Sequence, residues 1–407
     1  MILKTIDGKS VKPPYYLLDE DKLAGDYQKL KRAYSALYRK FLIAYSYKTN
    51  YVPYMCRLLH KWGAYAEVVS RLEYDLACRL TGNTSKIIFN GPVKSYDDIE
   101  TALNNQSIVN LDSFYEIENL GKYCRKYPRK KVKIGLRVNF ALSKDAGLPF
   151  KTSRFGFCFE NGDLRRALLK IKEIPNVKVA GLHSHFSTKT RSRFVFKEIT
   201  ARLCRIALNN LGGDVEYIDI GGNFGRAPRE MSQLKFPTFS EYANTITGEL
   251  KKHVNAKFKP YLIIEPGISL VGQAYSFICN VIEVKKVRKK KFVVLDGSAH
   301  NIKPTMHKFN LPVKVLDNNG ETKRGNENKY QVVGYTCMEA DILLQDFQGP
   351  EVKRGDFFVF ENAGAYTIVL NPPFIRPHPP IIARKNNEYK IVRHAENFRD
   401  FFATYTF

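Results

Sequence analysis

The feature that most constrains the fold is a pattern that recurs between about residues 40 and 270: a short run of β-forming residues, followed by a helical stretch. Amphipathic segments such as 52–62 and 194–211 separate the runs. The runs cover residues 42–46, 66–70, 86–90, 107–112, 132–139, 179–185, 217–221 and 261–265. Eight strands that alternate with helices over about 230 residues predict an α/β fold, a (β/α)8 barrel of the TIM type, with a doubly wound open sheet as the alternative.

Polar and ionisable residues gather at the carboxyl ends of these runs. The ends carry Lys48, Ser70, Asn90, Asp112, Arg137, His183, His185, Asp219, Gly221, Gly222 and Glu265. Barrel enzymes build their sites on this face, from the loops that follow the strands. The concentration of such residues favours the barrel and predicts a functional site at its mouth.

A second domain is expected because one compact core rarely grows past roughly 250–300 residues, and this chain has 407. After residue 272 the runs are rich in Val, Ile, Phe and Tyr, with Gly, Pro and Asn between them. This texture predicts an antiparallel β-domain. We therefore expect the barrel over residues 26–271 and the β-domain over 1–25 and 272–407.

The net charge is unusually high, with 65 Lys and Arg against 40 Asp and Glu, or +25. The basic residues cluster in short runs such as 125–131 and 285–291, which we expect to be solvated loops or strand edges. Charge by itself argues for solubility and non-specific binding, so nucleic acid is not expected to be a partner. No apolar run reaches the ~18 residues of a membrane span, and the seven scattered cysteines lack zinc spacing. We expect a cytoplasmic protein that does not contact a membrane.

Lys48 follows the first run, at the predicted buried end of a strand. An unpaired ammonium is costly there. The side chain therefore pairs with an anion or acts as an amine nucleophile, unless it is an ordinary surface lysine.

His183 and His185 end the sixth run, and we expect one imidazole to face the barrel mouth and the other to lie in the core. Together with Asp219 and Glu265 they also have the residue types of a metal site, so a metallohydrolase is an alternative. The Gly221-Gly222 turn is typical of a phosphate site after a barrel strand, or of a plain tight turn. Cys337 lies in the β-rich region, where a single cysteine is ordinarily an unreactive core residue.

Several segments match one known family in order and spacing. Residues 45–50, Tyr-Ser-Tyr-Lys-Thr-Asn, are similar to a cofactor-lysine motif, Tyr-Ala-Val-Lys-Ala-Asn. The other matching segments are 67–73, 89–95, 181–185, 219–222, 265–267, Cys337 and 364–367. Taken together they resemble the ornithine/diaminopimelate decarboxylases, fold-type III enzymes that use pyridoxal phosphate and share the alanine racemase-like fold.

The resemblance implies a role for each matching residue, and no metal. Lys48 would form a Schiff base with the cofactor, His185 would lie against its ring, and Glu265 would pair with the pyridine nitrogen. The residues implied to hold the phosphate and its surroundings are Thr188, Gly221, Gly222, Asn223, Gly267 and Tyr366. Cys337, supplied by a partner subunit, would reprotonate the carbanion. A homodimer with shared active sites is therefore implied.

Departures from the family pattern bear on phosphate binding and on the substrate. Ile268 stands where the family has a phosphate-contacting arginine, and Asn223 replaces the third glycine of its turn. Met338 replaces the acidic residue beside the cysteine, with Glu339 one place later. Lys303 stands where diaminopimelate enzymes have a carboxylate-binding arginine.

We therefore predict a decarboxylase of an amino acid or amino-acid conjugate with a distal carboxylate, such as a diaminopimelate-like compound or a precursor of a siderophore or other specialised metabolite. Lys303, Glu339 and Tyr366 are the predicted substrate-binding residues. The loss of the arginine at Ile268 keeps one alternative open, a non-catalytic or regulatory relative that binds pyridoxal phosphate.

Overall fold

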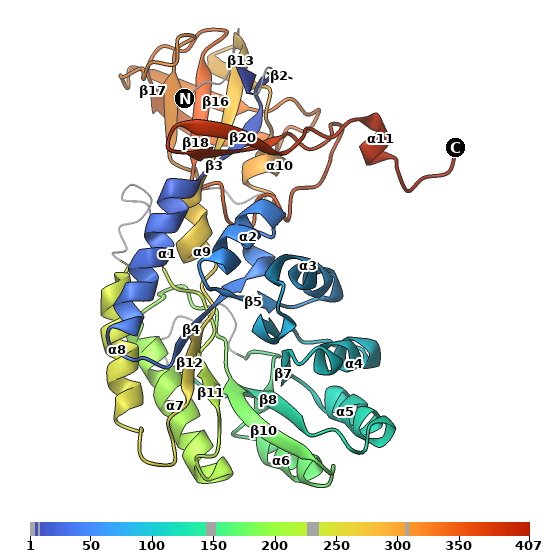
Figure 1. Ribbon diagram of the computed structural model, residues 1–407. Coiled ribbons are helices and arrows are strands. Elements are labelled where there is room, and N and C mark those ends of the chain that lie inside the picture. The colour runs from blue at the N-terminus through green and yellow to red at the C-terminus, as the bar shows by residue number, and fades with distance from the viewer. Residues whose placement is uncertain (1–4, 7–8, 144–151, 226–235, 306–308) are drawn as a thin grey trace. The chain divides into compact units, whose positions relative to one another are not determined.

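The computed structural model describes residues 5–6, 9–143, 152–225, 236–305 and 309–407, which form two compact units (Figure 1). One unit contains the described residues up to 26 and from 270 onward. The other contains the described residues from 27 to 269. Among the helices in these described ranges, none combines the length and apolar character of a membrane span.

A closed barrel of eight parallel strands forms the unit of residues 27–225 and 236–269. The strands are β4 (Phe41–Ser46), β5 (Tyr65–Val68), β6 (Ile87–Phe89), β7 (Ile108–Leu111), β8 (Val132–Asn139), β10 (Val177–His183), β11 (Tyr217–Asp219) and β12 (Tyr261–Ile264). The pairing of β8 with β10 and of β12 with β4 closes the ring, and β9 (Phe157–Cys158) extends it beside β8. The predicted (β/α)8 barrel is confirmed.

Helices lie around the outside of these strands (Figure 1). They are α1 (Glu20–Ser35), α2 (Pro53–Lys61), α3 (Arg71–Thr81), α4 (Tyr96–Asn104), α5 (Phe114–Lys126), α6 (Asp163–Lys172), α7 (Arg193–Leu211) and α8 (Phe239–Lys251), with short 3-10 turns η1 (Tyr47–Thr49) and η2 (Thr84–Lys86). Reciprocal capping starts two of them: Ser95 pairs with Asp98 in α4, and Thr238 pairs with Glu241 in α8. Such caps satisfy backbone N–H groups that a helix leaves free at its first turn.

Several strands end earlier than the sequence predicts, because the polar residues after them already belong to the loops. β5 ends at Val68, and Ser70 instead accepts a hydrogen bond from the backbone N–H of Glu73 as the cap of α3. β11 ends at Asp219, and Gly221 has a φ of +70°, which an extended strand does not allow. The site residues therefore sit on turns held by the strand ends.

A mixed sheet forms the other unit. Its strands are β3 (Tyr15–Asp19), β13 (Tyr275–Val287), β14 (Lys290–Leu295), β15 (Val313–Leu316), β16 (Asn328–Val333), β17 (Ile342–Gly349), β18 (Phe357–Glu361), β19 (Ile381–Lys385) and β20 (Glu388–Arg393), beside a small hairpin of β1 (Thr5–Ile6) and β2 (Lys9–Ser10). Its short helices are η4 (Gly272–Ala274), α10 (Ala299–Ile302) and α11 (Phe398–Phe401), and α9 (Ile268–Val271) contains residues of both units.

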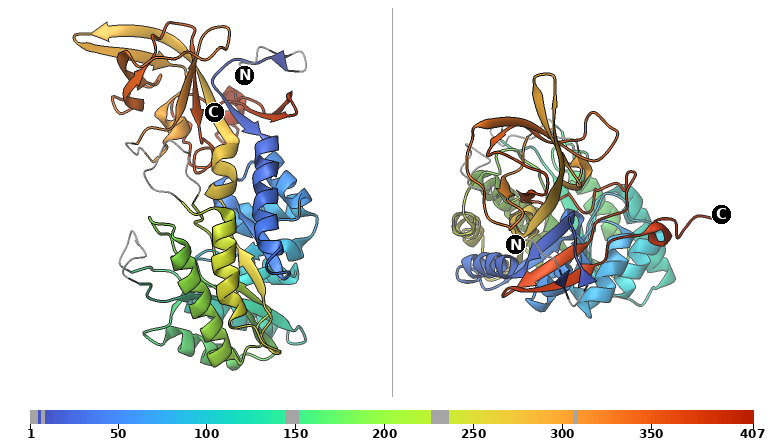
Figure 2. Two further views of the ribbon diagram at one scale, coloured as in Figure 1. Left: turned by 90° about the vertical axis from the view of Figure 1, so that its left-hand side faces the viewer. Right: turned by 90° about the horizontal axis from the view of Figure 1, so that it is seen from above.

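The prediction of a purely antiparallel β-domain is wrong in two pairings, since β14 pairs with β16, and β19 with β3, in parallel. The parallel pairing of β3 arises because this N-terminal strand inserts between β13 and β19, which alternating β-runs in the sequence cannot reveal. The β13–β14 hairpin projects from the sheet in both views of Figure 2. Residues 285–291 at its end are exposed, which confirms the expected solvated strand edge.

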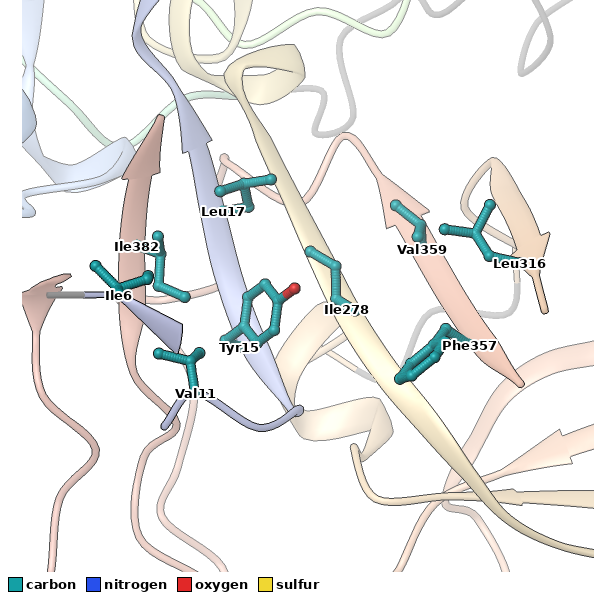
Figure 3. Close-up of a cluster of buried hydrophobic side chains, with 9 residues drawn as sticks. All are labelled: Ile6, Val11, Tyr15, Leu17, Ile278, Leu316, Phe357, Val359 and Ile382. Atoms are coloured by element: carbon teal, nitrogen blue, oxygen red, sulfur yellow. The ribbon is translucent and has the colours of Figure 1, made fainter. Parts of the chain in front are cut away.

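Apolar side chains from distant parts of the chain form the core of this sheet. Figure 3 shows them: Ile6, Val11, Tyr15, Leu17, Ile278, Leu316, Phe357, Val359 and Ile382, all less than 9% exposed. Burying one such side chain is worth roughly 1.5–3 kcal/mol. The N-terminal residues are therefore an integral part of the sheet that follows the barrel in the sequence.

Candidate active site

Lys48 lies in η1, directly after β4, and its ammonium is held by a buried carboxylate. The distance from Lys48 Nζ to Glu67 Oε2 is 2.6 Å, and the Ser46 hydroxyl donates to the same oxygen at 2.5 Å. Glu67 is 1% exposed, whereas about a third of the Lys48 side chain is exposed. The strand end therefore presents a primary amine to the barrel mouth, with an acceptor for its protons beneath it.

Glu265, directly after β12, is the second buried carboxylate at this end of the barrel, at 3% exposed. Asn90 Nδ2 donates to its Oε1 at 2.5 Å, and His183 Nε2 lies 3.5 Å from the same oxygen. Burial alone would raise the pKa of Glu265, but attraction to His183 and Lys48 lowers the pKa overall. The carboxylate is therefore ionised despite its burial.

Both imidazoles of the His-x-His segment approach Glu265, one of them buried and the other partly exposed, as expected of a core and a mouth position. His185 Nδ1 lies 3.9 Å from Glu265 Oε2, and His183 lies on the other carboxylate oxygen. Residues two apart in an extended chain share a face, which explains the convergence. They differ in exposure: 2% of the His183 side chain is exposed and 25% of that of His185.

His185 is a neutral imidazole. The N–H of Gly222 donates to its Nδ1 at 3.0 Å, which assigns the ring proton to Nε2. Burial, followed by repulsion from Lys48, lowers the pKa of His185 to about 3. The ring therefore offers an uncharged face and one donor at the barrel mouth.

Asp219 completes a buried cluster at the end of β11. It is 0% exposed, and its Oδ1 accepts the N–H of Gly221 at 3.0 Å. Burial, together with repulsion from Glu265, raises its pKa well above the usual range. One donor atom from each of His183, Asp219 and Glu265 lies within 4.8 Å of the others, so these residues alone also suit a cation.

The turn after β11 packs so closely that it requires glycine. A Cβ on Gly221 would lie 2.7 Å from His185 Nδ1, and one on Gly222 would lie 2.1 Å from the carbonyl oxygen of Glu265. The backbone of this turn is thereby locked between the ends of β10 and β12.

The neighbouring predicted phosphate residues lie beside this turn. Asn223 has a φ of +75°, and its Nδ2 donates to the carbonyl of Thr188 at 3.0 Å, which joins the two loops. A Cβ on Gly267 would lie 2.1 Å from Thr49 Oγ1, so Gly267 allows the Glu265 loop to pack against η1. Ile268, in the place of the family's arginine, is half-buried at the start of α9.

The remaining predicted residues lie in the other unit. Cys337 and Glu339 are exposed between β16 and β17, and Tyr366, with a φ of +55°, is 37% exposed. Lys303 is 3% exposed, and its Nζ lies 3.4 Å from Asn310 Oδ1. Burial lowers the pKa of Lys303 to about 8.

Asp341 is a residue of this unit that the sequence analysis missed. Its Oδ1 accepts from Ser298 Oγ at 2.9 Å and from the N–H of Ala299 at 2.7 Å. Its Oδ2 accepts from the hydroxyl of Thr336 at 2.7 Å and from its N–H at 3.1 Å. Asp341 therefore joins the turn that leads to Lys303 with the loop of Cys337. An acid four residues after the cysteine was the only available signal.

A buried ion pair, also missed, supports the loop after β6. Lys94 Nζ lies 3.0 Å from Glu116 Oε1, with both side chains 0% exposed, and it donates to the carbonyl of Gly91 at 2.8 Å. Glu116 also accepts the N–H groups of Lys94 and Asp112, at 2.9 and 2.7 Å. This pair holds the backbone that follows Asn90.

The comparisons with known proteins agree on one family. A family model described as the pyridoxal binding domain of pyridoxal-dependent decarboxylases matches residues 24–272. The chain is 26% identical to a diaminopimelate decarboxylase of Aquifex aeolicus, over 90% of this chain and 86% of the relative. It is also 26% identical to the L-glutamyl-[BtrI acyl-carrier protein] decarboxylase of Niallia circulans. That match covers 97% of this chain and 94% of the relative.

A solved structure adds agreement in three dimensions. The crystal structure of a diaminopimelate decarboxylase from Helicobacter pylori, complexed with L-lysine, matches with a TM-score of 0.83 and 25% sequence identity. The match covers 97% of this chain and 96% of that one. The match to the family model contains Lys48, Glu67, Asn90, His185 and Glu265. These matches therefore favour a pyridoxal site over a metal site at this end of the barrel.

Proposed function

The chain belongs to the family of pyridoxal-dependent decarboxylases, and from this premise we propose that it removes the α-carboxylate of an amino acid, or amino-acid conjugate, that carries a second, distal carboxylate. The observation that carries the cofactor site is one cluster: the amine of Lys48, 2.6 Å from Glu67, joined through Asn90 to Glu265. The observation that carries the substrate class is the buried ammonium of Lys303.

The residues of the barrel fit pyridoxal phosphate. The group needs a primary amine to hold it, an ionised carboxylate for its ring nitrogen and a turn for its phosphate. Lys48 is the amine, Glu265 is the ionised carboxylate, and the turn at Gly221-Gly222 has no room for a side chain. When bound, the cofactor supplies an electron sink for the electron pair left by loss of carbon dioxide.

The protein's own residues set the protonation states in this site. Glu67 Oε2 accepts a hydrogen bond from the Lys48 ammonium, which holds the amine in place and stabilises its charged form. Glu265 remains ionised and can accept a hydrogen bond from a protonated ring nitrogen. His185 stays neutral, which avoids a second positive charge beside that ring.

Phosphate binding in this chain rests on backbone and amide groups. Ile268 cannot supply the arginine contact of the family pattern. We assign the phosphate to the turn of Gly221, Gly222 and Asn223, with Thr188, Gly267 and Tyr366 around it. Backbone N–H groups of glycine-rich turns bind phosphate without any cationic side chain.

Cys337 and Tyr366 belong to the sheet-containing unit, and we assign Cys337 the return of a proton to the substrate carbon. Its exposure on a loop is consistent with donation into the site of a second subunit. The proposed assembly is therefore a homodimer with shared active sites. Lys303 binds the distal carboxylate, with Glu339 and Tyr366 beside the substrate.

Borohydride reduction with pyridoxal phosphate, followed by peptide mapping, tests the cofactor site. We expect the label on Lys48, and a label elsewhere would overturn the assignment. Carbon dioxide release is then measured with meso-diaminopimelate, glutamate, ornithine and lysine. We expect a compound with a distal carboxylate to turn over fastest. A labelled chain that releases no carbon dioxide from any such substrate would instead be a regulatory relative.

A further inference from the structure

A chain of buried hydrogen bonds crosses the interior of the barrel. It begins at Tyr217 on β11, whose hydroxyl donates to Asn110 Oδ1 at 2.6 Å. Asn110 on β7 donates in turn from Nδ2 to Asn90 Oδ1 at 2.8 Å. These three side chains are at most 6% exposed, so bulk water does not compete for their hydrogen bonds.

At its end this chain divides between the two carboxylates of the candidate site. Asn90 Nδ2 donates to Glu67 Oε1 at 3.1 Å and to Glu265 Oε1 at 2.5 Å. Glu67 is the partner of Lys48, and Glu265 is the partner proposed for the cofactor ring. One amide group therefore connects the carboxylate beside Lys48 to the carboxylate proposed for the ring nitrogen of the cofactor.

The chemistry of the partners fixes how Asn90 is oriented. Ionised carboxylates only accept hydrogen bonds, so the amide must present its nitrogen to Glu67 and Glu265. Its oxygen then needs a donor, which Asn110 supplies. The orientation of the Asn110 amide is fixed in the same manner. The Tyr217 hydroxyl donates to its Oδ1, so its Nδ2 faces Asn90.

The barrel wall is shaped for this chain. A Cβ at position 135 on β8 would lie 1.9 Å from Asn110 Oδ1 and 2.1 Å from the Tyr217 hydroxyl, so Gly135 leaves the necessary space. Gly181 on β10 does the same, since a Cβ there would lie 2.2 Å from the Tyr217 ring. Strands β8 and β10 thus carry glycine where the hydrogen-bonded side chains pass. The barrel is therefore shaped to accommodate this series of hydrogen bonds.

We propose that Asn90 is a positioning residue that ties the carboxylate beside the cofactor lysine to the carboxylate beside the cofactor ring, and that Asn110 and Tyr217 hold it in that orientation. The inference rests on the proposed function, which assigns Lys48 and Glu265 to the cofactor. The Asn90 amide donates a hydrogen bond to each of the two carboxylates without adding a charge of its own.

Loss of the Asn90 amide should make Glu265 easier to protonate, because a hydrogen bond to the charged form favours that form. The other titratable groups that face Glu265 remain in place. They are Lys48 on η1, Glu67 on β5, His183 and His185 at and after the end of β10, and Asp219 on β11. A change confined to Asn90 therefore reports on the amide.

The variants Asn90→Leu and Tyr217→Phe test this, with Asn119→Leu as the matched control. Asn119, on α5, is also 1% exposed but takes no part in this series of hydrogen bonds. Each purified protein is titrated with pyridoxal phosphate, and the absorbance of the bound cofactor is followed against pH. For Asn90→Leu we expect roughly 10- to 100-fold weaker cofactor binding. The midpoint of the absorbance change on the acidic side of the titration should rise by about one to two pH units. Tyr217→Phe should shift the midpoint in the same direction but less, and Asn119→Leu should shift neither quantity.

Folded Asn90→Leu protein with an unchanged midpoint and unchanged cofactor binding would overturn the proposal. Should that variant fail to fold, Tyr217→Phe removes a single hydroxyl and decides alone: a raised midpoint supports the proposal and an unchanged one overturns it. If wild-type protein carries no cofactor on Lys48, the proposed function and this inference both fail. A wild type labelled on Lys48 with unresponsive variants sinks only the inference.

Discussion

Glu67 holds the ammonium of Lys48 at 2.6 Å, and this pair joins a fully buried carboxylate to an amine that is a third exposed. The neighbouring Ser46 hydroxyl on the same oxygen leaves the carboxylate little freedom to turn away. Lys48 is therefore positioned before any cofactor arrives. This preorganisation removes a rotational cost from cofactor attachment.

Glu67→Gln should shift the pH dependence of cofactor attachment downward. A carboxylate stabilises the ammonium, which cannot attack a carbonyl, so its removal yields the free amine at lower pH. We expect the midpoint of the attachment rate against pH to fall by about one unit, since one unit corresponds to about 1.4 kcal/mol. Stopped-flow absorbance with apoprotein measures the rate. Glu100→Gln, which removes the partner of the surface residue Lys126, is the control, and an equal shift there would contradict the prediction.

Replacing Lys303 should affect only substrates that carry a distal carboxylate. Lys303→Ala removes a buried cation, so the KM for such a substrate should rise roughly 10- to 100-fold while the KM for lysine or ornithine stays the same. The pKa of Lys303 is lowered to about 8, so its charge is lost as the pH rises through that value. In wild-type protein the KM for the carboxylate substrate should therefore increase above about pH 8. A flat pH profile that the variant does not alter would contradict this assignment.

Asp341→Asn should disturb the loop that carries Cys337, the residue proposed to return a proton to the substrate. The substitution puts an N–H₂ group where Oδ1 or Oδ2 accepts two donors, so the Cys337 loop should lose its link to Ala299. We expect turnover to fall roughly 10²-fold, as for a displaced catalytic group, with cofactor labelling at Lys48 unchanged. Asp317→Asn is the matched control, because Asp317 also accepts two backbone N–H groups but lies in an exposed turn. Normal turnover of Asp341→Asn would show that the link does not position the loop.

The ion pair of Lys94 and Glu116 should dominate the stability of the loop after β6. Lys94→Met leaves an unpaired carboxylate with no exposure to water, which typically costs about 3–5 kcal/mol. Urea unfolding of the barrel measures the change in free energy. Lys126→Met breaks a surface pair and should cost less than about 1 kcal/mol. Equal effects of the two variants would refute the distinction between the buried and the exposed pair.

Shared active sites predict complementation between two inactive proteins. Lys48→Ala and Cys337→Ala should each lack activity, and mixing with subunit exchange should restore up to about a quarter of the wild-type rate. The fraction follows because random exchange makes half of the dimers mixed, and each mixed dimer has one intact site. Mixing Lys48→Ala with the double variant is the control and should restore nothing. No recovery after proven exchange would count against sharing.

The barrel and its site-bearing end were predictable from the sequence because the information is local. Each strand and helix is encoded in a run of a few residues, and the polar residues that follow Ser46, Val68 or Ile264 mark the strand ends. Lys48 and Glu265 could thus be assigned to one face of the barrel without coordinates. Motif order then pointed to the cofactor, which the family match supports.

The tertiary structure alone decided which of these residues touch. Asn90 reaches Glu265, 175 positions away, and Tyr217 reaches Asn110, because the closed ring of strands sets the register across the barrel. The same register brings His183 and His185 to one carboxylate. The local pattern specifies on which strand end a side chain sits, but distances across a barrel depend on how all eight strands pair at once. That pairing is a property of the whole ring, and no single segment of the sequence contains it.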